Sequence, residues 1–163
     1  RSSLAISFII HRLSRRMSHQ NFDTSFPSDT VKGQEVQERI IAAMEQNQYS
    51  DKDVFGMRLA LEEALVNAIK HGNGMDPNKQ VFVSCQVDDR EARITIRDEG
   101  EGFDPSDVPD PTDEGNLEKP GGRGIMLMKA FMSEVTYSDD GNEVLLVKHR
   151  EVETEDDPSP VPE

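Results

Sequence analysis

The amino-acid sequence predicts an α+β fold, a two-layer sandwich in which helices cover one face of a mixed sheet. Apolar residues recur at helical spacing in two long segments and alternate at strand spacing in two others. Turn residues separate two further short strands near the C-terminus. Strands that meet through hairpins, with helices gathered between them, are typical of this architecture.

The first expected elements are a strand over residues 21–27 and two helices. Pro27 closes the strand, and Ser28 and Asp29 are favourable N-caps for a first helix whose apolar positions continue to Met44. A second helix begins at Ser50 and runs to residue 71, where glycines at positions 72 and 74 end it.

Two strands, a short helix and a hairpin are expected next. Val81–Val87 and Glu91–Arg97 alternate apolar and polar residues, and Cys85 lies on the apolar side, as is typical of a core cysteine. After irregular sequence at 100–122, a short apolar helix spans Gly124–Met132. The final hairpin pairs residues 134–138 with residues 143–149 across an Asp-Asp-Gly-Asn turn.

Composition and charge exclude several classes of function. The chain has 163 residues, with 18 basic and 32 acidic side chains and a net charge of −14. This balance argues against binding to nucleic acid, which requires Lys and Arg, and against docking on an anionic membrane. One cysteine offers neither a disulfide nor a zinc cluster, which favours a reducing compartment. No apolar run approaches the ~20 residues that a membrane span requires.

The charge also divides the chain into three predicted parts. Residues 1–20 carry four arginines and no acid, and residues 151–163 carry six acids, three prolines and no base. We expect both to be disordered and to flank a folded domain at 21–150. We interpret residues 1–16 as an upstream extension ahead of Met17, with a genuine amphipathic arm as the alternative.

One segment of the second helix carries polar side chains at a chemically useful spacing. Glu63 and Asn67 are four positions apart and therefore share a helical face, which Lys70 and His71 continue. Taken alone, this segment also fits a solvated helix surface.

Two glycine-rich segments follow. Asp98 ends a strand before Gly100 and Gly102, where a carboxylate can accept a hydrogen bond from an exocyclic amine and glycine permits close approach to the backbone. Gly122 and Gly124 run directly into a helix, whose N-terminal N–H groups are suited to phosphate. Taken alone, the first of these segments also fits a plain turn.

Together these segments resemble the GHKL ATPase superfamily of gyrase, heat-shock chaperone, histidine kinase and mismatch-repair ATPases. Its N box is similar to residues 63–67, its first glycine box to residues 98–102 and its second to residues 122–124. The resemblance covers roughly residues 22–149 and implies a Bergerat-type ATP-binding fold. The E-A-x-x-N-A-x-x-H-G-N form of the N box is most similar to the anti-sigma factor serine/threonine kinases of bacterial partner switching.

The resemblance implies a catalytic pair on the second helix. Asn67 would bind Mg²⁺ through its side-chain oxygen, because this hard cation prefers oxygen ligands. Glu63 would accept the proton of the attacking serine hydroxyl. Glu62 is the rival base, but its side chain lies ~100° around the helix, on the wrong face for Asn67.

The resemblance also implies the nucleotide contacts. Asp98 would accept a hydrogen bond from the adenine amino group, Gly102 would let the base pack on the backbone, and residues 122–124 would hold the phosphates. Lys70 and His71 either approach the phosphates or only end the helix. The full set of expected ATP contacts is Asn67, Lys70, His71, Asp98, Gly100, Gly102, Gly122, Arg123 and Gly124.

The implied function is that of a cytoplasmic, Mg-ATP-dependent serine/threonine kinase that is also an anti-sigma factor. Its expected substrate is an antagonist protein with a STAS domain, its second partner is a sigma factor or another regulator, and relatives of this type act as homodimers. Two alternatives stay open: an ATP-dependent binding switch without kinase activity, and a stand-alone histidine-kinase catalytic domain.

Residues 103–120, between the glycine boxes, are the ATP lid by this resemblance. The stretch has four prolines and six acids against one lysine. We expect it to become ordered when Mg-ATP binds, so hydrogen exchange of the backbone amides between Gly102 and Gly122 should slow on addition of Mg-ATP. Exchange that Mg-ATP leaves unchanged would contradict this expectation.

Overall fold

The computed structural model describes residues 20–102 and 122–152. The expectations for the N-terminal extension, the lid and the acidic tail concern residues outside these ranges, apart from Gln20, Glu151 and Val152.

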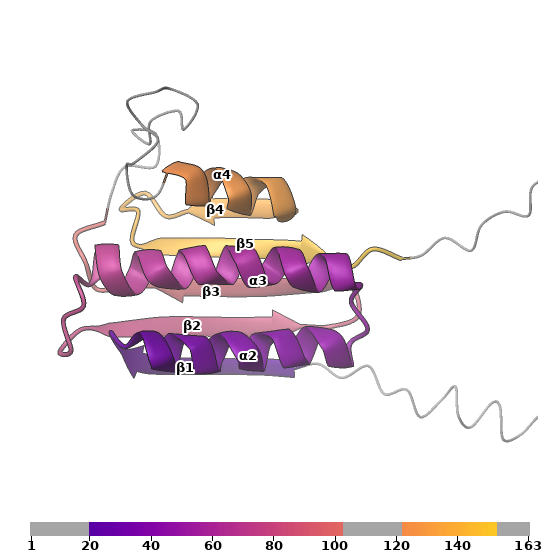
Figure 1. Cartoon of the computed structure of the whole chain (residues 1–163), viewed down its shortest axis with the longest axis horizontal. Helices are drawn as coiled ribbons and strands as arrows, with labels where there is room; N and C mark the ends of the chain where they lie inside the picture. The colour runs from indigo at the N-terminus through magenta and orange to yellow at the C-terminus, as the bar shows by residue number, and fades with distance from the viewer. Residues whose placement is uncertain (1–19, 103–121, 153–163) are drawn as a thin grey trace, which may run out of the picture.

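Five strands form one sheet in the order β1-β2-β3-β5-β4, and the helices cover one of its faces (Figure 1). The strands are β1 (Gln20–Pro27), β2 (Gln80–Val87), β3 (Glu91–Arg97), β4 (Glu134–Tyr137) and β5 (Glu143–His149). The helices are α2 (Thr30–Gln46), α3 (Asp51–Val66), the π-helix η1 (Asn67–Gly72) and α4 (Gly122–Phe131). The predicted two-layer α+β sandwich is therefore confirmed.

The strand directions differ from the prediction. Every strand pair in the described part of the chain is antiparallel, so the expected mixed sheet is wrong in this detail. β4 runs in the same direction as β3, but the hairpin places β5 between them, so no parallel pair forms.

The core lies between the sheet and the helices. Ile40 of α2, Leu61 of α3, Ile94 of β3 and Leu146 of β5 are fully buried, and each such side chain contributes roughly 1.5–3 kcal/mol of transfer free energy. Cys85 is also buried, and burial raises its pKa to about 12. The thiol therefore remains protonated at neutral pH, as expected of a core cysteine.

The helix starts follow the predicted caps. The Asp29 carboxylate accepts a hydrogen bond of 2.8 Å from the Val31 N–H at the start of α2. The Ser50 hydroxyl accepts one of 3.1 Å from the Asp53 N–H at the start of α3. Such caps satisfy N–H groups that have no partner within the helix. α4 begins at Gly122, two residues before its predicted start.

A buried ion pair fixes the end of the described chain to the start of α3. The Asp53 carboxylate is fully buried, lies 3.5 Å from Lys148 Nζ and accepts a hydrogen bond of 3.1 Å from the Glu151 N–H. β1 begins at the same end of the molecule (Figure 1). The first and last described residues therefore both lie at the N-terminal end of α3.

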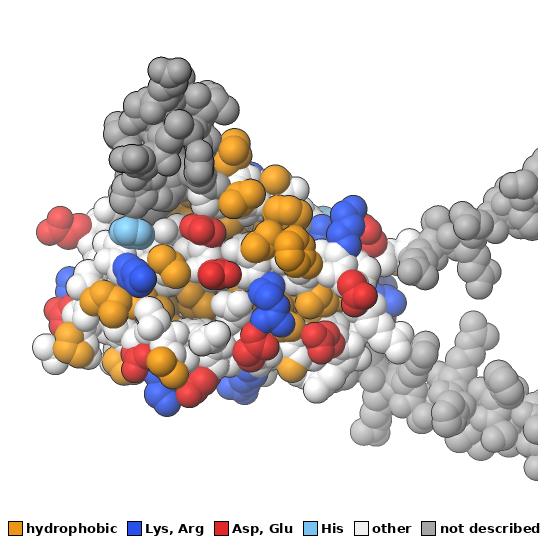
Figure 2. Space-filling view, viewed as in Figure 1, with side chains coloured by type: hydrophobic (Ala, Val, Ile, Leu, Met, Phe, Trp, Pro, Cys, Tyr) orange, Lys and Arg blue, Asp and Glu red, His pale blue; other side chains and the backbone are white. Residues whose placement is uncertain are grey.

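Apolar side chains gather on the outer surface where α3 meets α4 (Figure 2). Phe55 of α3 and two residues of α4, Met126 and Leu127, are exposed. Phe55 contacts Phe131 edge to face with ring centroids 6.1 Å apart, so an aromatic contact joins the two helices.

None of the helices in the described ranges is both long and apolar enough to cross a lipid bilayer.

Candidate functional site

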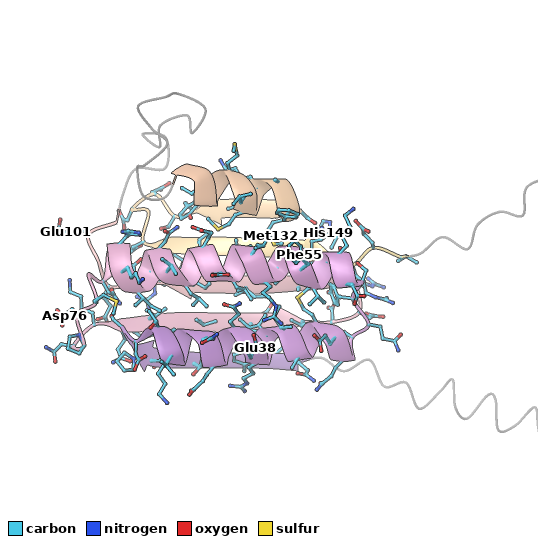
Figure 3. All side chains as sticks on the ribbon, in the orientation of Figure 1. Glu38, Phe55, Asp76, Glu101, Met132 and His149 are labelled. Atoms are coloured by element: carbon cyan, nitrogen blue, oxygen red, sulfur yellow. The ribbon has the colours of Figure 1, made fainter. Side chains whose placement is uncertain are left out.

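The predicted site residues gather at one end of the molecule. Here α3 continues into η1, β3 leads into the first glycine segment, and α4 begins. Asp76 and Glu101, which follow η1 and β3, mark this end in Figure 3, whereas His149 lies at the other end. Three segments that are far apart in the sequence therefore meet here.

The Glu63 side chain connects the first and third predicted segments. Glu63 and Asn67 are both partly exposed, whereas Leu65 and Ala68 are buried, as predicted. The Glu63 carboxylate lies against Gly124, so close that a Cβ at position 124 would overlap its Oε2. A side chain at position 124 would therefore require the Glu63 carboxylate to move.

The helix widens at Asn67. In η1 the Asn73 N–H donates a hydrogen bond of 2.9 Å to the Ala68 carbonyl, five residues earlier, which is the π-helical pattern. The predicted regular helix to residue 71 is thus wrong in its last turn. The wider turn shifts Lys70 and His71 around the axis relative to Glu63, and both side chains are exposed.

Asn73 is a buried residue that links four segments, and it was missed in the sequence analysis. Its Nδ2 donates to Ser28 Oγ at 3.0 Å and to the Gln80 carbonyl at 2.9 Å, while its Oδ1 accepts from the Glu99 N–H at 2.8 Å. One amide therefore ties the end of η1 to the connection between β1 and α2, to β2 and to the first glycine segment. The sequence did give a signal for Asn73, because this residue follows His71-Gly72 at the end of the N-box motif.

Asp98 is the buried carboxylate of the site. Its N–H donates a hydrogen bond of 2.9 Å to the Asn142 carbonyl, and its Oδ1 accepts one of 2.8 Å from the Gly100 N–H. Gly72 lies against the same carboxylate, where a Cβ would overlap it. Both the strand end and the helix end therefore hold this side chain.

Burial raises the pKa of Asp98 above its ordinary value, against the lowering effects of the Gly100 N–H and of the charges on Lys79 and Arg97. Because Gly100 occupies one carboxylate oxygen, the other can accept a hydrogen bond from a ligand. An exocyclic amine is a donor of the right kind.

The glycines at this end allow close backbone approach. A Cβ at Gly100 would overlap the Gly72 carbonyl, and one at Gly102, whose φ is +78°, would overlap the Asp140 carbonyl in the β4–β5 turn. Gly72 is the last residue of η1, as predicted, and it also makes room for the Asp98 carboxylate. The expected role of Gly102 beside an adenine base stays a prediction.

The second glycine segment forms the start of α4. Gly122 and Arg123 are its first two residues, and the Arg123 side chain lies outside the described part of the chain. The contact between Gly124 and Glu63 places this first turn beside the predicted catalytic pair.

Comparison with known proteins gives a family. Residues 26–148, more than half of the chain, match the family described as the histidine kinase-like ATPase domain. The chain belongs to this family. The resemblance to GHKL ATPases is thereby confirmed.

Curated relatives of this histidine kinase-like ATPase domain are anti-sigma F factors. The protein from Geobacillus thermodenitrificans is 37% identical over 99 residues, which are 57% of this chain and 67% of the relative. The protein from Shouchella clausii is 38% identical over 82 residues, 48% of this chain and 56% of the relative. The protein from Heyndrickxia coagulans is 32% identical over 118 residues, 68% of this chain and 80% of the relative. The chain thus spans between about half and four fifths of these relatives.

A solved structure shares the fold. The RsbU and RsbW domains of a protein from Mycobacterium tuberculosis superpose with a TM-score of 0.55 at 14% identity, covering 80% of this chain and 32% of that one. At this identity the similarity shows the fold alone.

Membership in the histidine kinase-like ATPase family implies nucleotide binding, and the residues at the site fit a nucleotide. Asp98 is a buried carboxylate that can accept a hydrogen bond. Gly72 and Gly100 let the neighbouring backbone approach this carboxylate closely. In the described ranges no group of three or more His, Cys, Asp or Glu side chains could hold a metal ion. Mg²⁺ commonly keeps waters and phosphate oxygens as ligands, so a single amide such as Asn67 suits a metal that arrives with the nucleotide.

Asp98→Asn should weaken ATP binding by at least about tenfold. In its expected role Asp98 accepts one hydrogen bond from the Gly100 N–H and one from the adenine amino group, whereas an asparagine amide has a single oxygen. An unsatisfied buried polar group costs about 1–3 kcal/mol, and about 1.4 kcal/mol corresponds to a factor of ten. Isothermal titration calorimetry with ATP measures the change.

Asp88→Asn is the matched control. Its Oδ1 accepts the backbone N–H groups of Arg90 and Glu91 in the β2–β3 turn, at the opposite end of these strands. ATP affinity should be unchanged in this variant. Equal affinity in the wild type and in Asp98→Asn would remove Asp98 from the binding site.

The raised pKa of Asp98 predicts a pH dependence of stability. Because the folded state binds this proton more tightly than the unfolded state, the group stabilises the fold below its unfolded pKa of about 3.9. That contribution is lost as the pH rises through the higher folded pKa. In urea unfolding, the free energy of the wild type minus that of Asp98→Asn should therefore decrease from acid to neutral pH. A difference that does not vary with pH would contradict this.

Proposed function

We propose that the chain binds Mg-ATP at this end of the sandwich and phosphorylates a serine or threonine of a small antagonist protein with a STAS domain. In its other state it holds a sigma factor, or another regulator, inactive. The observation that carries the proposal is the contact between Glu63 and the start of α4, because it joins the proposed base to the proposed phosphate site.

Glu63 is the proposed general base. Its carboxylate accepts the proton of the substrate hydroxyl while that oxygen bonds to the γ-phosphorus, and the bond from the γ-phosphorus to the leaving ADP oxygen breaks. Partial exposure leaves the carboxylate within reach of a protein substrate. Glu62 is exposed and belongs to another face of α3.

The other residues bind the nucleotide in this proposal. Mg²⁺, when bound with ATP, neutralises phosphate charge, and Asn67 Oδ1 is the proposed protein ligand. The backbone of residues 122–124 lies at a helix N-terminus, where N–H groups favour phosphate, and the Arg123 charge adds to this. Lys70 and His71 stay proposed phosphate contacts, because both are exposed basic side chains in η1, three and four positions after Asn67.

The names of the curated relatives support one of the two proposed protein partners. Proteins with 32–38% identity are anti-sigma F factors, which supports a sigma factor as the sequestered protein. A homodimer and a cytoplasmic location belong to the same proposal, and light scattering of the purified full chain tests the dimer.

Glu63→Gln should retain ATP binding and lose phosphoryl transfer by about 10²–10⁴-fold, the usual contribution of a general base. Glutamine keeps the shape of the side chain beside Gly124 but cannot take up the proton. Transfer of labelled γ-phosphate to a purified STAS protein measures the rate. Glu62→Gln is the matched control and should transfer at the wild-type rate.

The chemistry of the product separates the alternatives. Phosphoserine and phosphothreonine survive acid, whereas phosphohistidine does not, so an acid-labile product would indicate a histidine-kinase catalytic domain. ATP binding without transfer to any candidate STAS protein would favour a binding switch. Wild-type transfer by Glu63→Gln would remove Glu63 from its proposed role.

A further inference from the structure

Three hydrogen bonds form a closed ring beside the first glycine segment. Asn73 Nδ2 donates to the Gln80 carbonyl at 2.9 Å, and the Gln80 N–H donates to Glu99 Oε2 at 3.1 Å. The Glu99 N–H donates back to Asn73 Oδ1 at 2.8 Å and closes the ring. The ring therefore joins the residue after η1, the first residue of β2 and the residue after Asp98.

The partners of the Asn73 amide fix its orientation in the ring. The Gln80 carbonyl can only accept and the Glu99 N–H can only donate, so the amide nitrogen and oxygen cannot exchange places. The second hydrogen on Nδ2 is donated to Ser28 Oγ at 3.0 Å. Because Asn73 is buried, turning the amide would leave several polar groups without a partner. The side chain is therefore held in one geometry.

The ring holds the two backbone segments that contact the Asp98 carboxylate. Gly72, directly before Asn73, lies against this carboxylate. Gly100, directly after Glu99, donates its N–H to Asp98 Oδ1 at 2.8 Å. The bond between Asn73 and Glu99 joins these two segments, so it limits how far the carboxylate can turn or shift.

We propose that Asn73 is a positioning residue, which keeps the Asp98 carboxylate where it selects an adenine base over a guanine base. This inference rests on the proposed function, in which Asp98 meets the base of ATP. Adenine has an amine at C6, which donates to a carboxylate, whereas guanine has a carbonyl oxygen there, which repels it. A carboxylate free to move would escape this repulsion, so selection depends on its being held in place.

The test is the ratio of the affinities for ATP and GTP, measured by calorimetry on the full chain. Both nucleotides carry the same triphosphate, so the ratio reports contacts with the base. The wild type should prefer ATP, and in Asn73→Ala the ratio should fall by about tenfold. A substitution that only loosens the fold would weaken both nucleotides equally, so a ratio equal to that of the wild type would overturn the inference.

Asn47→Ala is the matched control. Asn47 is also a buried asparagine, and its Nδ2 donates a hydrogen bond of 2.9 Å to the Ala43 carbonyl. It follows α2 and precedes the start of α3, at the end of that helix remote from η1. The ratio in Asn47→Ala should be that of the wild type, and an equal loss in both variants would overturn the inference.

A double variant tests whether Asn73 acts through Asp98. In the background of Asp98→Asn, Asn73→Ala should not lower the ratio further, because the carboxylate that it positions is already gone. Additive losses would overturn the inference.

A second pair of variants opens the ring at an exposed residue, so the test does not depend on the folding of Asn73→Ala. Glu99→Ala removes the acceptor of the Gln80 N–H, whereas Glu99→Gln retains an oxygen for it. Both variants lose the same charge. The ratio should be about two- to tenfold lower in Glu99→Ala than in Glu99→Gln, and equal ratios in the two would overturn the inference.

The wild type separates a failure of this inference from a failure of the proposed function. Wild-type protein that binds neither nucleotide would overturn the proposed function and the inference together. Wild-type protein that binds ATP and GTP equally would overturn the inference and leave ATP binding in place. A preference for ATP that Asn73→Ala retains would overturn the role of Asn73 alone.

Discussion

The site depends on the direct approach of η1 to the end of β3. The Gly72 backbone lies against both Gly100 and the Asp98 carboxylate, with no space for a Cβ at either glycine. The Asn73 amide then ties the same two segments together from a buried position. Because these contacts join a long helix to a central strand, Asp98 and Glu63 are held relative to one another by rigid elements.

Most of the fold could be predicted from periodicity and caps. The strands of the β2–β3 and β4–β5 hairpins and the caps at Asp29 and Ser50 lie at or next to their predicted positions, because each is a local pattern. The antiparallel sheet could not be predicted in the same way. It depends on β5 inserting between β3 and β4, which local sequence does not specify.

Part of the site could also be predicted from local sequence patterns. The shared face of Glu63 and Asn67 follows from helical spacing. Asn73, which follows the π-helical turn, forms hydrogen bonds to three other segments, and these are apparent only in the folded chain.

The buried Asp53–Lys148 pair has a practical consequence for handling the protein. Together with the Glu151 N–H it fixes the exit of the chain at the N-terminal end of α3, where β1 also begins. The sixteen residues of α3, roughly 24 Å in length, separate that end from η1. Immobilising the folded domain through either flank would therefore leave the nucleotide-binding end facing solution, open to a protein as large as a sigma factor.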